Sequence, residues 1–221
     1  ETLRAEPRGS VRITCPVTLL HVHIGPMLAR FMARYPGVTL HLEATNRRVD
    51  VVGEGIDVAI RVRPRPIEDS DLVMRVLADR GHRLVASPEL LMRQGTPETL
   101  EDLTRLDSIA MSAPDGKAVW VLSGPHGAQQ TVHHSPRYVA DDLLTLKFAA
   151  LAGTGICWLP DYMCQHEMQQ GRLVQLLPEW SQPPGIVHAV FASRRGLSPA
   201  VRGFLDFLGE TARGAKGDAP Q

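Results

Sequence analysis

The first part of the chain, up to Arg63, contains three short runs of β-branched and aliphatic residues: VRITCPV at 11–17, VTLHLEAT at 38–45 and DVAIRV at 57–62. Such runs are typical of strands. The first two flank GPMLARFMARYPG at 25–37, whose apolar residues recur at helical spacing and which stops at a proline and a glycine. This strand, helix, strand order predicts parallel strands joined by right-handed crossover connections.

Polar residues follow each of the three predicted strands. We predict a second, short helix over RRVDVVGE at about 47–54, ending at Gly55. In an open parallel sheet, ligands bind beyond the carboxyl ends of the strands. These ends carry hydroxyl, amide and guanidinium groups at Thr14 to Thr18, Thr45-Asn46 and Arg61 to Arg63, which suit a small anion or a polar organic molecule. The alternative is structural: Thr45-Asn46 cap a helix, and Arg61 pairs with a nearby acid.

The pattern restarts after the polar loop RPRPIEDSD at 63–71, which indicates a second lobe. This part predicts a strand that turns into a helix at Ser87-Pro88, then a helix capped by Thr96, then short antiparallel strands between Ser108 and His134. The chain has two candidate crossings between lobes, near Asp79 to Gly81 and within PEWSQPPG before Gly185. Two lobes joined in this way would face each other across a cleft and close around a ligand.

The last part of the chain alternates helix and strand. We predict a helix capped by Asp141 or Asp142, a buried strand GICWLP, and a helix at about Asp161–Gln169. Two more strands, RLVQLLP and GIVHAVFAS, precede a helix capped by Ser198. The polar tail is expected to be disordered.

Composition excludes several classes of function. Acidic and basic residues balance at 24 each, so nucleic acid would have to be bound by another segment. The three cysteines, Cys15, Cys157 and Cys164, lie in unrelated contexts, which favours buried thiols in a reducing compartment. No run is long enough to span a bilayer, and the first residues, ETLRAEPRG, are too charged for a signal peptide. We therefore expect a cytoplasmic protein with no membrane partner.

The sequence offers no persuasive catalytic or metal-binding arrangement. The glycine pair at 153 and 155 lies between a helix and a strand, the reverse of a dinucleotide-binding turn. The histidine pairs at 21/23 and 133/134 do not share a face of their elements, so neither chelates a metal readily. Asp141-Asp142 fit a helix cap better than a pair of catalytic acids, and Cys15 lacks an evident base. We expect no catalytic residue, no cofactor and no metal site.

Three motifs, RYPGVTLHLE, EGIDVAIR and ALAGTGICWLP, occur in an order and at spacings that closely resemble the effector-binding domain of LysR-type transcriptional regulators. The resemblance covers about residues 9–210. It implies an α/β, two-lobe, periplasmic-binding-protein-like (type 2) fold, with a cleft between the lobes and two hinge crossings. The segment LADRGHRLVAS departs from the form common in the family, which affects what can be carried over to the second lobe.

The resemblance also implies a division of the chain. Residues 1–8 would be the remnant of a linker helix, 9–80 plus 185–210 lobe I, 81–184 lobe II, and 211–221 a disordered tail. Carried over by position, the inducer contacts would be Cys15, Pro16, Val17, Thr18, Thr45, Asn46, Arg61 and Val62, with Tyr138, Val139 and Ala140 from the second lobe.

The partners implied by the resemblance are a small-molecule effector, a second copy of the chain, and DNA. DNA would be bound only through an N-terminal helix-turn-helix domain that this chain lacks. The domains would pair side by side as a homodimer, with the helix Pro26–Tyr35 of one copy near the helix Asp142–Ala152 of the other, and the full-length protein would form a homotetramer. The alternatives are a solute-binding protein of a transport system and a small α/β enzyme.

Overall fold

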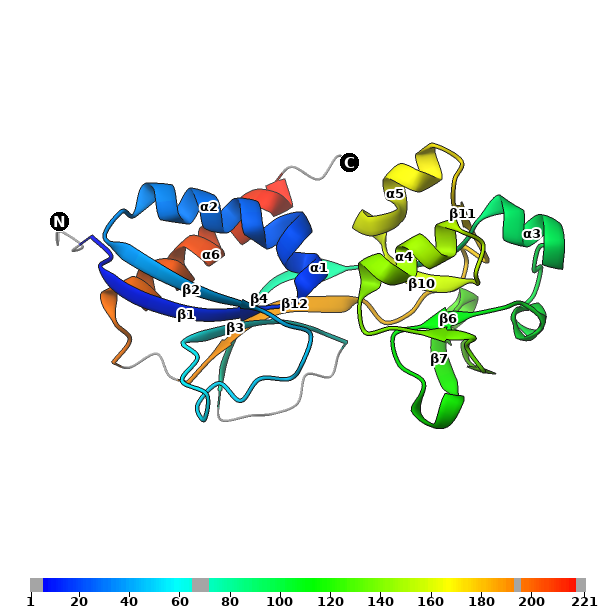
Figure 1. The fold of residues 1–221 in the computed structure, drawn as a ribbon, viewed down its shortest axis with the longest axis horizontal. Coiled ribbons are helices and arrows are strands. Elements are labelled where there is room, and N and C mark those ends of the chain that lie inside the picture. Colours follow the sequence, from blue (N-terminus) through cyan, green and yellow to red (C-terminus); the bar gives the residue numbers. More distant parts are fainter. Residues whose placement is uncertain (1–5, 65–71, 193–195, 218–221) are drawn as a thin grey trace. The chain divides into compact units, whose positions relative to one another are not determined.

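The computed structural model describes residues 6–64, 72–192 and 196–217. The chain divides into two compact units (Figure 1): unit 1 is Glu1–Asp79 with Ile186–Gln221, and unit 2 is Arg80–Gly185. The chain therefore passes between the units twice. Most of the expected linker remnant, residues 1–5, and most of the loop after the third strand, residues 65–71, lie outside the described residues.

Unit 1 is built on a mixed sheet with strand order β2-β1-β3-β12-β4. Its strands are β1 (Gly9–Cys15), β2 (Val38–Ala44), β3 (Val58–Arg63), β4 (Val73–Arg80) and β12 (Gly185–Phe191). Strand β1 pairs in parallel with both β2 and β3, which confirms the predicted pairing. The returning strand β12 runs antiparallel to β3.

Helices cover one face of this sheet. They are α1 (Val17–Leu19), the π-helical η1 (Leu20–Ile24), α2 (Gly25–Arg34) and α6 (Pro199–Gly217). Figure 1 shows α2 and α6 side by side on the sheet, and Phe31 of α2 packs edge-on against Phe204 of α6 with ring centroids 5.2 Å apart.

The start of the first helical segment and the end of the last helix, α6, both differ from prediction. Helical structure begins at Val17 rather than at Gly25, because the Asn46 side chain, distant in sequence, accepts the Val17 N–H. The tail expected to be disordered at 211–221 is helical through Gly217, so that prediction is wrong for 211–217. The helix continues from a packed turn, since Ala212 still contacts the core of unit 1. Residues 218–221 lie outside the described part.

The opposite face of the sheet is covered by residues 46–57, where the predicted helix at 47–54 is wrong. The chain forms a turn at 51–55, with Gly55 at φ 64°. Val49 and Val51 are both buried, packed with Ile56 against Ala59 and Val190. Two buried residues separated by one position cannot lie on one face of a helix, so packing on the sheet selects the extended path.

Unit 2 contains smaller sheets. Its elements are β5 (His82–Ala86), α3 (Pro88–Gln94), η2 (Glu101–Arg105), β6 (Ile109–Ala110), η3 (Pro114–Gly116), β7 (Ala118–Ser123), η4 (Pro125–Gly127), β8 (Gln129–His134), β9 (Tyr138–Val139), α4 (Leu143–Leu151), β10 (Cys157–Pro160), α5 (Asp161–Gln169) and β11 (Val174–Gln175). Strand β5 lies between β10 and β11 and is antiparallel to both. The hairpin β7–β8 is antiparallel, as predicted.

Two predictions in unit 2 are wrong, and two more are confirmed. Strand β6 pairs in parallel with β9, not antiparallel to its neighbours in sequence. Thr96 caps no helix; instead the Asp102 carboxylate at the start of η2 accepts the Glu98 and Thr99 N–H groups at 3.1 and 3.0 Å. The cap of α4 is confirmed, since Asp142 accepts the Thr145 N–H at 2.9 Å. The predicted bounds of α5 are also confirmed.

A largely buried ion-pair cluster joins α4 to α5 within unit 2. Lys147 lies 2.7 Å from Glu167, and their side chains are 18% and 8% exposed. Arg172, which is half exposed, lies 3.4 Å from the same carboxylate oxygen. Burial works against ionisation of Glu167, but the Lys147 hydrogen bond, its own backbone and the charges of Lys147 and Arg172 outweigh it and lower the pKa of this carboxyl.

Candidate functional site

The strands β1 and β2 end at the same edge of the unit 1 sheet. Cys15, the last residue of β1, lies opposite Ala44, the last residue of β2. The Thr45 N–H then donates to the Cys15 carbonyl at 2.9 Å. Strand β3 runs beside β1 with Ala59 opposite Thr14, so its carboxyl end reaches the same edge.

Asn46 joins the segment after β2 to the helical segment after β1. Its side-chain Oδ1 accepts the Val17 N–H at 3.1 Å, and Val17 is the first residue of α1. An N–H in the first turn of a helix has no partner within the helix, so this side chain satisfies it. Asn46 therefore caps a helix, which was the alternative to a ligand contact. The helix is α1, which precedes Asn46 in the chain.

Cys15 and Thr18 are both buried in unit 1. Cys15 is 0% exposed, lies in the core beneath the helices, and has its pKa raised to about 12 by burial. Its thiol is therefore neutral and inaccessible as a nucleophile. Thr18 is 7% exposed. Of the predicted residues of this stretch, Pro16 and Val17 are the more exposed pair.

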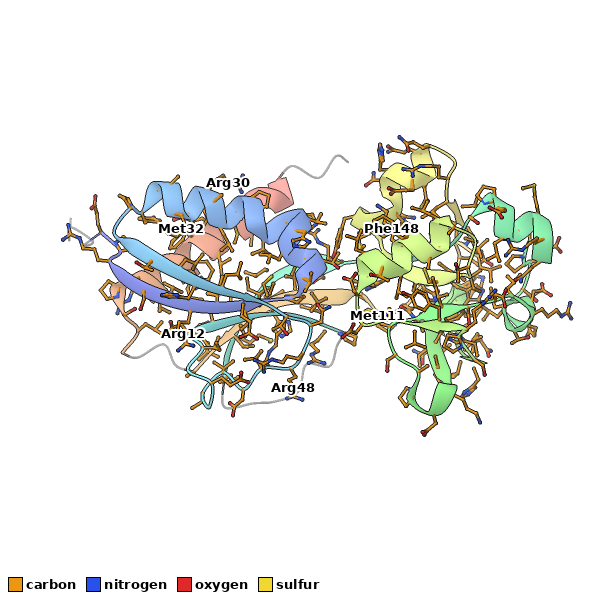
Figure 2. All side chains as sticks on the ribbon, viewed as in Figure 1. Arg12, Arg30, Met32, Arg48, Met111 and Phe148 are labelled. Carbon is orange, nitrogen blue, oxygen red and sulfur yellow. The ribbon has the colours of Figure 1, made fainter. Side chains whose placement is uncertain are left out.

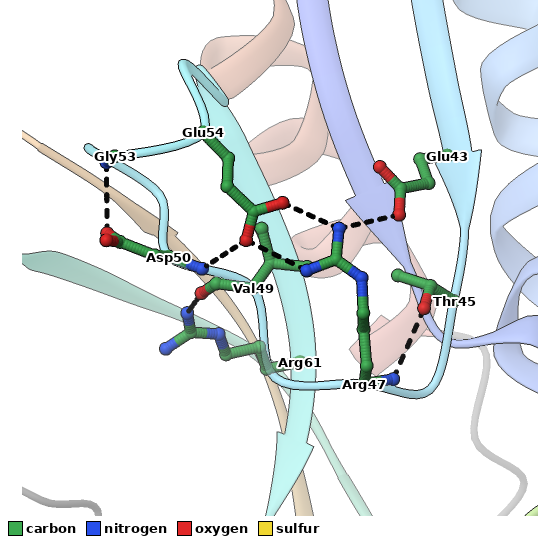
Figure 3. Close-up of polar contacts among 8 residues, drawn as sticks. All are labelled: Glu43, Thr45, Arg47, Val49, Asp50, Gly53, Glu54 and Arg61. Atoms are coloured by element: carbon green, nitrogen blue, oxygen red, sulfur yellow. Dashed lines mark hydrogen bonds and ion pairs between the residues drawn. The ribbon is translucent and has the colours of Figure 1, made fainter.

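Arg61 is half-buried and bonds to the chain that covers the sheet (Figure 3). Its Nη2 donates to the Val49 carbonyl at 2.7 Å. The alternative prediction was that Arg61 pairs with a nearby acid. Within the described residues, none of its hydrogen bonds goes to an acidic side chain. Burial lowers the pKa of Arg61, and the positive charges of Arg48 and Arg63 lower it further.

The residues beside Arg61 define its surroundings. His188 of β12 lies opposite it in register and is 1% exposed. Val62, the next predicted contact, is 36% exposed. Because side chains alternate along a strand, it lies on the same face of β3 as Val58 and Ile60, the face that the helices cover. Arg61 thus bonds to Val49, whereas Asn46 bonds to Val17 and Thr45 to Cys15.

A charged network that the pattern analysis missed lies directly beside Asn46. Arg47 forms two hydrogen bonds to the Glu54 carboxylate, at 2.8 and 2.6 Å, and one to Glu43 at 2.9 Å (Figure 3). The Asp50 N–H also donates to Glu54 at 3.0 Å. These bonds lower the pKa of Glu54 to about 2. The sequence signal for this network is an arginine between two glutamates, Glu43, Arg47 and Glu54. A helix over 47–54 would hold Arg47 and Glu54 apart, so that prediction hides the network.

Tyr138, Val139 and Ala140 belong to unit 2. Tyr138 and Val139 form β9 and are 37% and 45% exposed. The Ala140 N–H donates to the Ala110 carbonyl at 3.1 Å, which extends the pairing with β6, and its side chain packs on the unit 2 core.

The helix that follows β9 carries exposed apolar side chains. On α4, Leu144 is 38% and Phe148 61% exposed, and Figure 2 shows Phe148 on this helix. Among the described residues, no group of three or more histidine, cysteine or acidic side chains could hold a metal ion. Within the same residues, every helix is too short or too polar to cross a bilayer.

Comparison with known proteins gives consistent results across nearly the whole chain. The family model described as LysR substrate binding domain matches residues 4–213. An HTH-type transcriptional regulator of Xanthomonas campestris pv. campestris is 33% identical over 210 residues, covering 93% of this chain and 60% of the relative. The chain therefore spans less than two thirds of that relative's length.

Solved structures agree with the sequence comparison. The full-length Vibrio cholerae virulence activator AphB, a member of the LTTR protein family, matches with a TM-score of 0.81 and 29% identity, over 93% of this chain and 69% of AphB. The regulatory domain of CrgA, a LysR-type transcriptional regulator from Neisseria meningitidis, matches with a TM-score of 0.77 and 28% identity, over 93% of this chain and 100% of that domain.

Proposed function

Because the chain belongs to the LysR family of transcriptional regulators, as its substrate-binding or effector domain, we propose that it senses a small molecule and relays occupancy to a DNA-binding domain outside these residues. The observation that carries the proposal is the match of the family model to residues 4–213. The relatives are named HTH-type regulators, which favours this function over a transport solute-binding protein.

The predicted fold class is confirmed: the chain has the two-lobe α/β fold of the periplasmic-binding-protein type 2 shared by LysR regulatory domains. The prediction that the chain is not an enzyme is confirmed by its membership of a non-enzymatic family. We propose that units 1 and 2 are the lobes expected at 9–80 plus 185–210 and at 81–184, and that the effector binds between them.

The proposed contacts are the strand-end residues of unit 1 and β9 of unit 2: Cys15, Pro16, Val17, Thr18, Thr45, Asn46, Arg61, Val62, Tyr138, Val139 and Ala140. Cys15 is wholly buried and its carbonyl accepts the Thr45 N–H, so its contribution would be to hold Thr45 in place. Asn46 accepts the Val17 N–H and Thr45 donates to the Cys15 carbonyl, so hydrogen bonds join the ends of β1 and β2, which supports a common role.

Arg61 supports an anionic effector. It is half-buried near Arg48 and Arg63, and its hydrogen bond goes to a neutral carbonyl. An anion beside it would offset both burial and like-charge repulsion, and a carboxylate can bond a guanidinium through two oxygens. We therefore propose a small carboxylate or similarly charged molecule.

A calorimetric titration of a panel of small carboxylates tests this proposal. The Arg61→Ala variant should bind the best panel member more weakly by about 1–3 kcal/mol, as expected for a charge-assisted hydrogen bond. The matched control is Arg12→Ala, which removes an exposed arginine from β1, outside the helices proposed to pair (Figure 2). Equal affinity of wild type and Arg61→Ala would remove Arg61 from the site. Failure of every carboxylate to bind the wild type would contradict an anionic effector.

We further propose that two copies pair through α2 and α4, and that effector binding changes the geometry of this homodimer and of a homotetramer in the full-length protein. The exposed apolar residues Leu144 and Phe148 support a covered α4, since soluble monomers seldom leave such faces open. An effector can shift this geometry only by its difference in affinity between the two arrangements. DNA would be bound through the N-terminal domain, in the cytoplasm.

A further inference from the structure

Arg47 occupies a special place in the candidate site because it directly follows Thr45 and Asn46. Its backbone N–H donates to the Thr45 hydroxyl oxygen at 3.3 Å. Thr45 is fixed on its other side by its N–H bond to the Cys15 carbonyl. The backbone on both sides of Asn46 is therefore tied down, and the Asn46 amide is directed to Val17.

The guanidinium of Arg47 joins two separate pieces of chain. Glu43 lies in β2, before the turn that contains Asn46, and Glu54 lies near the end of the segment that covers the sheet (Figure 3). Arg47 binds Glu54 with two nitrogens and Glu43 with one of the same pair. The two-nitrogen bond to Glu54 needs a planar, forked cation, and a lysine ammonium has no such fork.

The exposure of this network argues against a role in global stability. The side chains of Arg47, Glu43 and Glu54 are 48%, 46% and 37% exposed, and exposed ion pairs contribute little to the free energy of folding. A multidentate network can nevertheless hold a turn in one geometry, and a binding site gains affinity when its groups are held in place before the ligand arrives.

We propose that Arg47 is a positioning residue: held by Glu43 and Glu54, it fixes Thr45 and Asn46 so that Asn46 stays bonded to the Val17 N–H at the edge where the effector binds. The link to the effector rests on the function proposed above. The positioning of Asn46 does not, so the two can be tested separately.

Hydrogen exchange of individual amides by NMR tests the positioning. In Arg47→Gln and Glu54→Gln, the Val17 amide should exchange about five- to ten-fold faster than in wild type, as expected when a hydrogen bond loses its support. Arg47→Lys should not restore the wild-type rate, because the fork is lost. The Val38 amide, bonded to the Tyr35 carbonyl at the other end of β2, should be unchanged, as should the midpoint of urea unfolding.

The matched control is Arg34→Gln, which breaks the exposed Arg34–Glu210 pair of 3.1 Å in the same unit. It should leave the Val17 exchange rate unchanged. If Val17 exchanges at the wild-type rate in Arg47→Gln, or if Val17 and Val38 accelerate together, Arg47 does not position Asn46 and the inference is overturned.

A titration with the best carboxylate of the panel tests the link to the effector. Arg47→Gln should weaken its binding about five-fold, and the same change made in Asn46→Ala should cause no further loss, because Arg47 acts through Asn46. A full additional loss in the double variant would overturn this route. If no carboxylate binds the wild type, the proposed effector class fails, and the Val17 exchange rates still decide the role of Arg47.

Discussion

Replacing Lys147 by methionine should strongly destabilise the chain, because it leaves the Glu167 carboxylate without its nearest positive partner. Lys147 and Glu167 are 2.7 Å apart and only 18% and 8% exposed. Breaking a buried ion pair by removing one partner costs about 3–5 kcal/mol. Arg172 remains 3.4 Å away and offsets part of this loss, so we expect a decrease of about 2–3 kcal/mol in the free energy of unfolding at pH 7.

The pH dependence of this loss identifies its cause. In wild type the pKa of Glu167 is lowered below 4.5, so its stabilisation is present above that pH and is lost as the pH falls through the folded-state value. In Lys147→Met, burial should instead raise this pKa. At pH 7 the ionised Glu167 then destabilises the folded variant, and protonation at lower pH removes this cost. The difference in free energy of unfolding between variant and wild type should therefore shrink toward pH 4.5.

Urea unfolding followed by far-ultraviolet circular dichroism at pH 7 and pH 5 measures this effect. The control Arg172→Met removes the half-exposed partner and should cost less than about 1 kcal/mol. Adding Glu167→Gln to Lys147→Met should recover part of the stability, since no buried charge remains. Equal losses at both pH values, or no recovery in the double variant, would show that Lys147 acts through packing and would refute the electrostatic reasoning.

Three further outcomes are expected. Phe148→Glu should raise the dimer dissociation constant at least about ten-fold in sedimentation equilibrium, and a wild-type chain that is monomeric at all concentrations would exclude the proposed α4 contact. Asp142→Ala should lower the free energy of unfolding by about 1 kcal/mol through loss of the Thr145 cap, measured by urea unfolding. Burial lowers the pKa of His134 to about 4. The free energy of unfolding should therefore fall as the pH drops from 6.5 to 4, because in this range His134 is protonated only in the unfolded chain. His134→Asn should flatten this part of the stability profile, and an unchanged profile would exclude His134 as its source.

Elements whose signals are local were predictable from the sequence. The parallel pairing of β1 with β2 followed from strand, helix and strand signals within 11–45, and the bounds of α5 and the Asp142 cap followed from neighbouring residues. The polar groups at the strand ends were also predictable, since parallel strands must end at a common edge.

The path of residues 46–57 was not predictable in the same way. Helical propensity over 47–54 competes with burial of Val49 and Val51 on a sheet that includes β12, which comes more than a hundred residues later. The parallel pairing of β6 with β9 likewise joins strands separated by the whole β7–β8 hairpin. In both places, contacts distant in sequence outweigh the local preference.

The sequence by itself determined the family, the α/β class and the residue types at the strand ends, because periodicity, caps and motif spacing are properties of short stretches. Only the tertiary structure decided what those residues do locally: Cys15 is sealed in the core, Arg61 bonds the Val49 carbonyl, and Asn46 caps a helix that precedes it. The physical reason is that burial and hydrogen-bond partners depend on which distant segments pack together, and no short stretch carries that information.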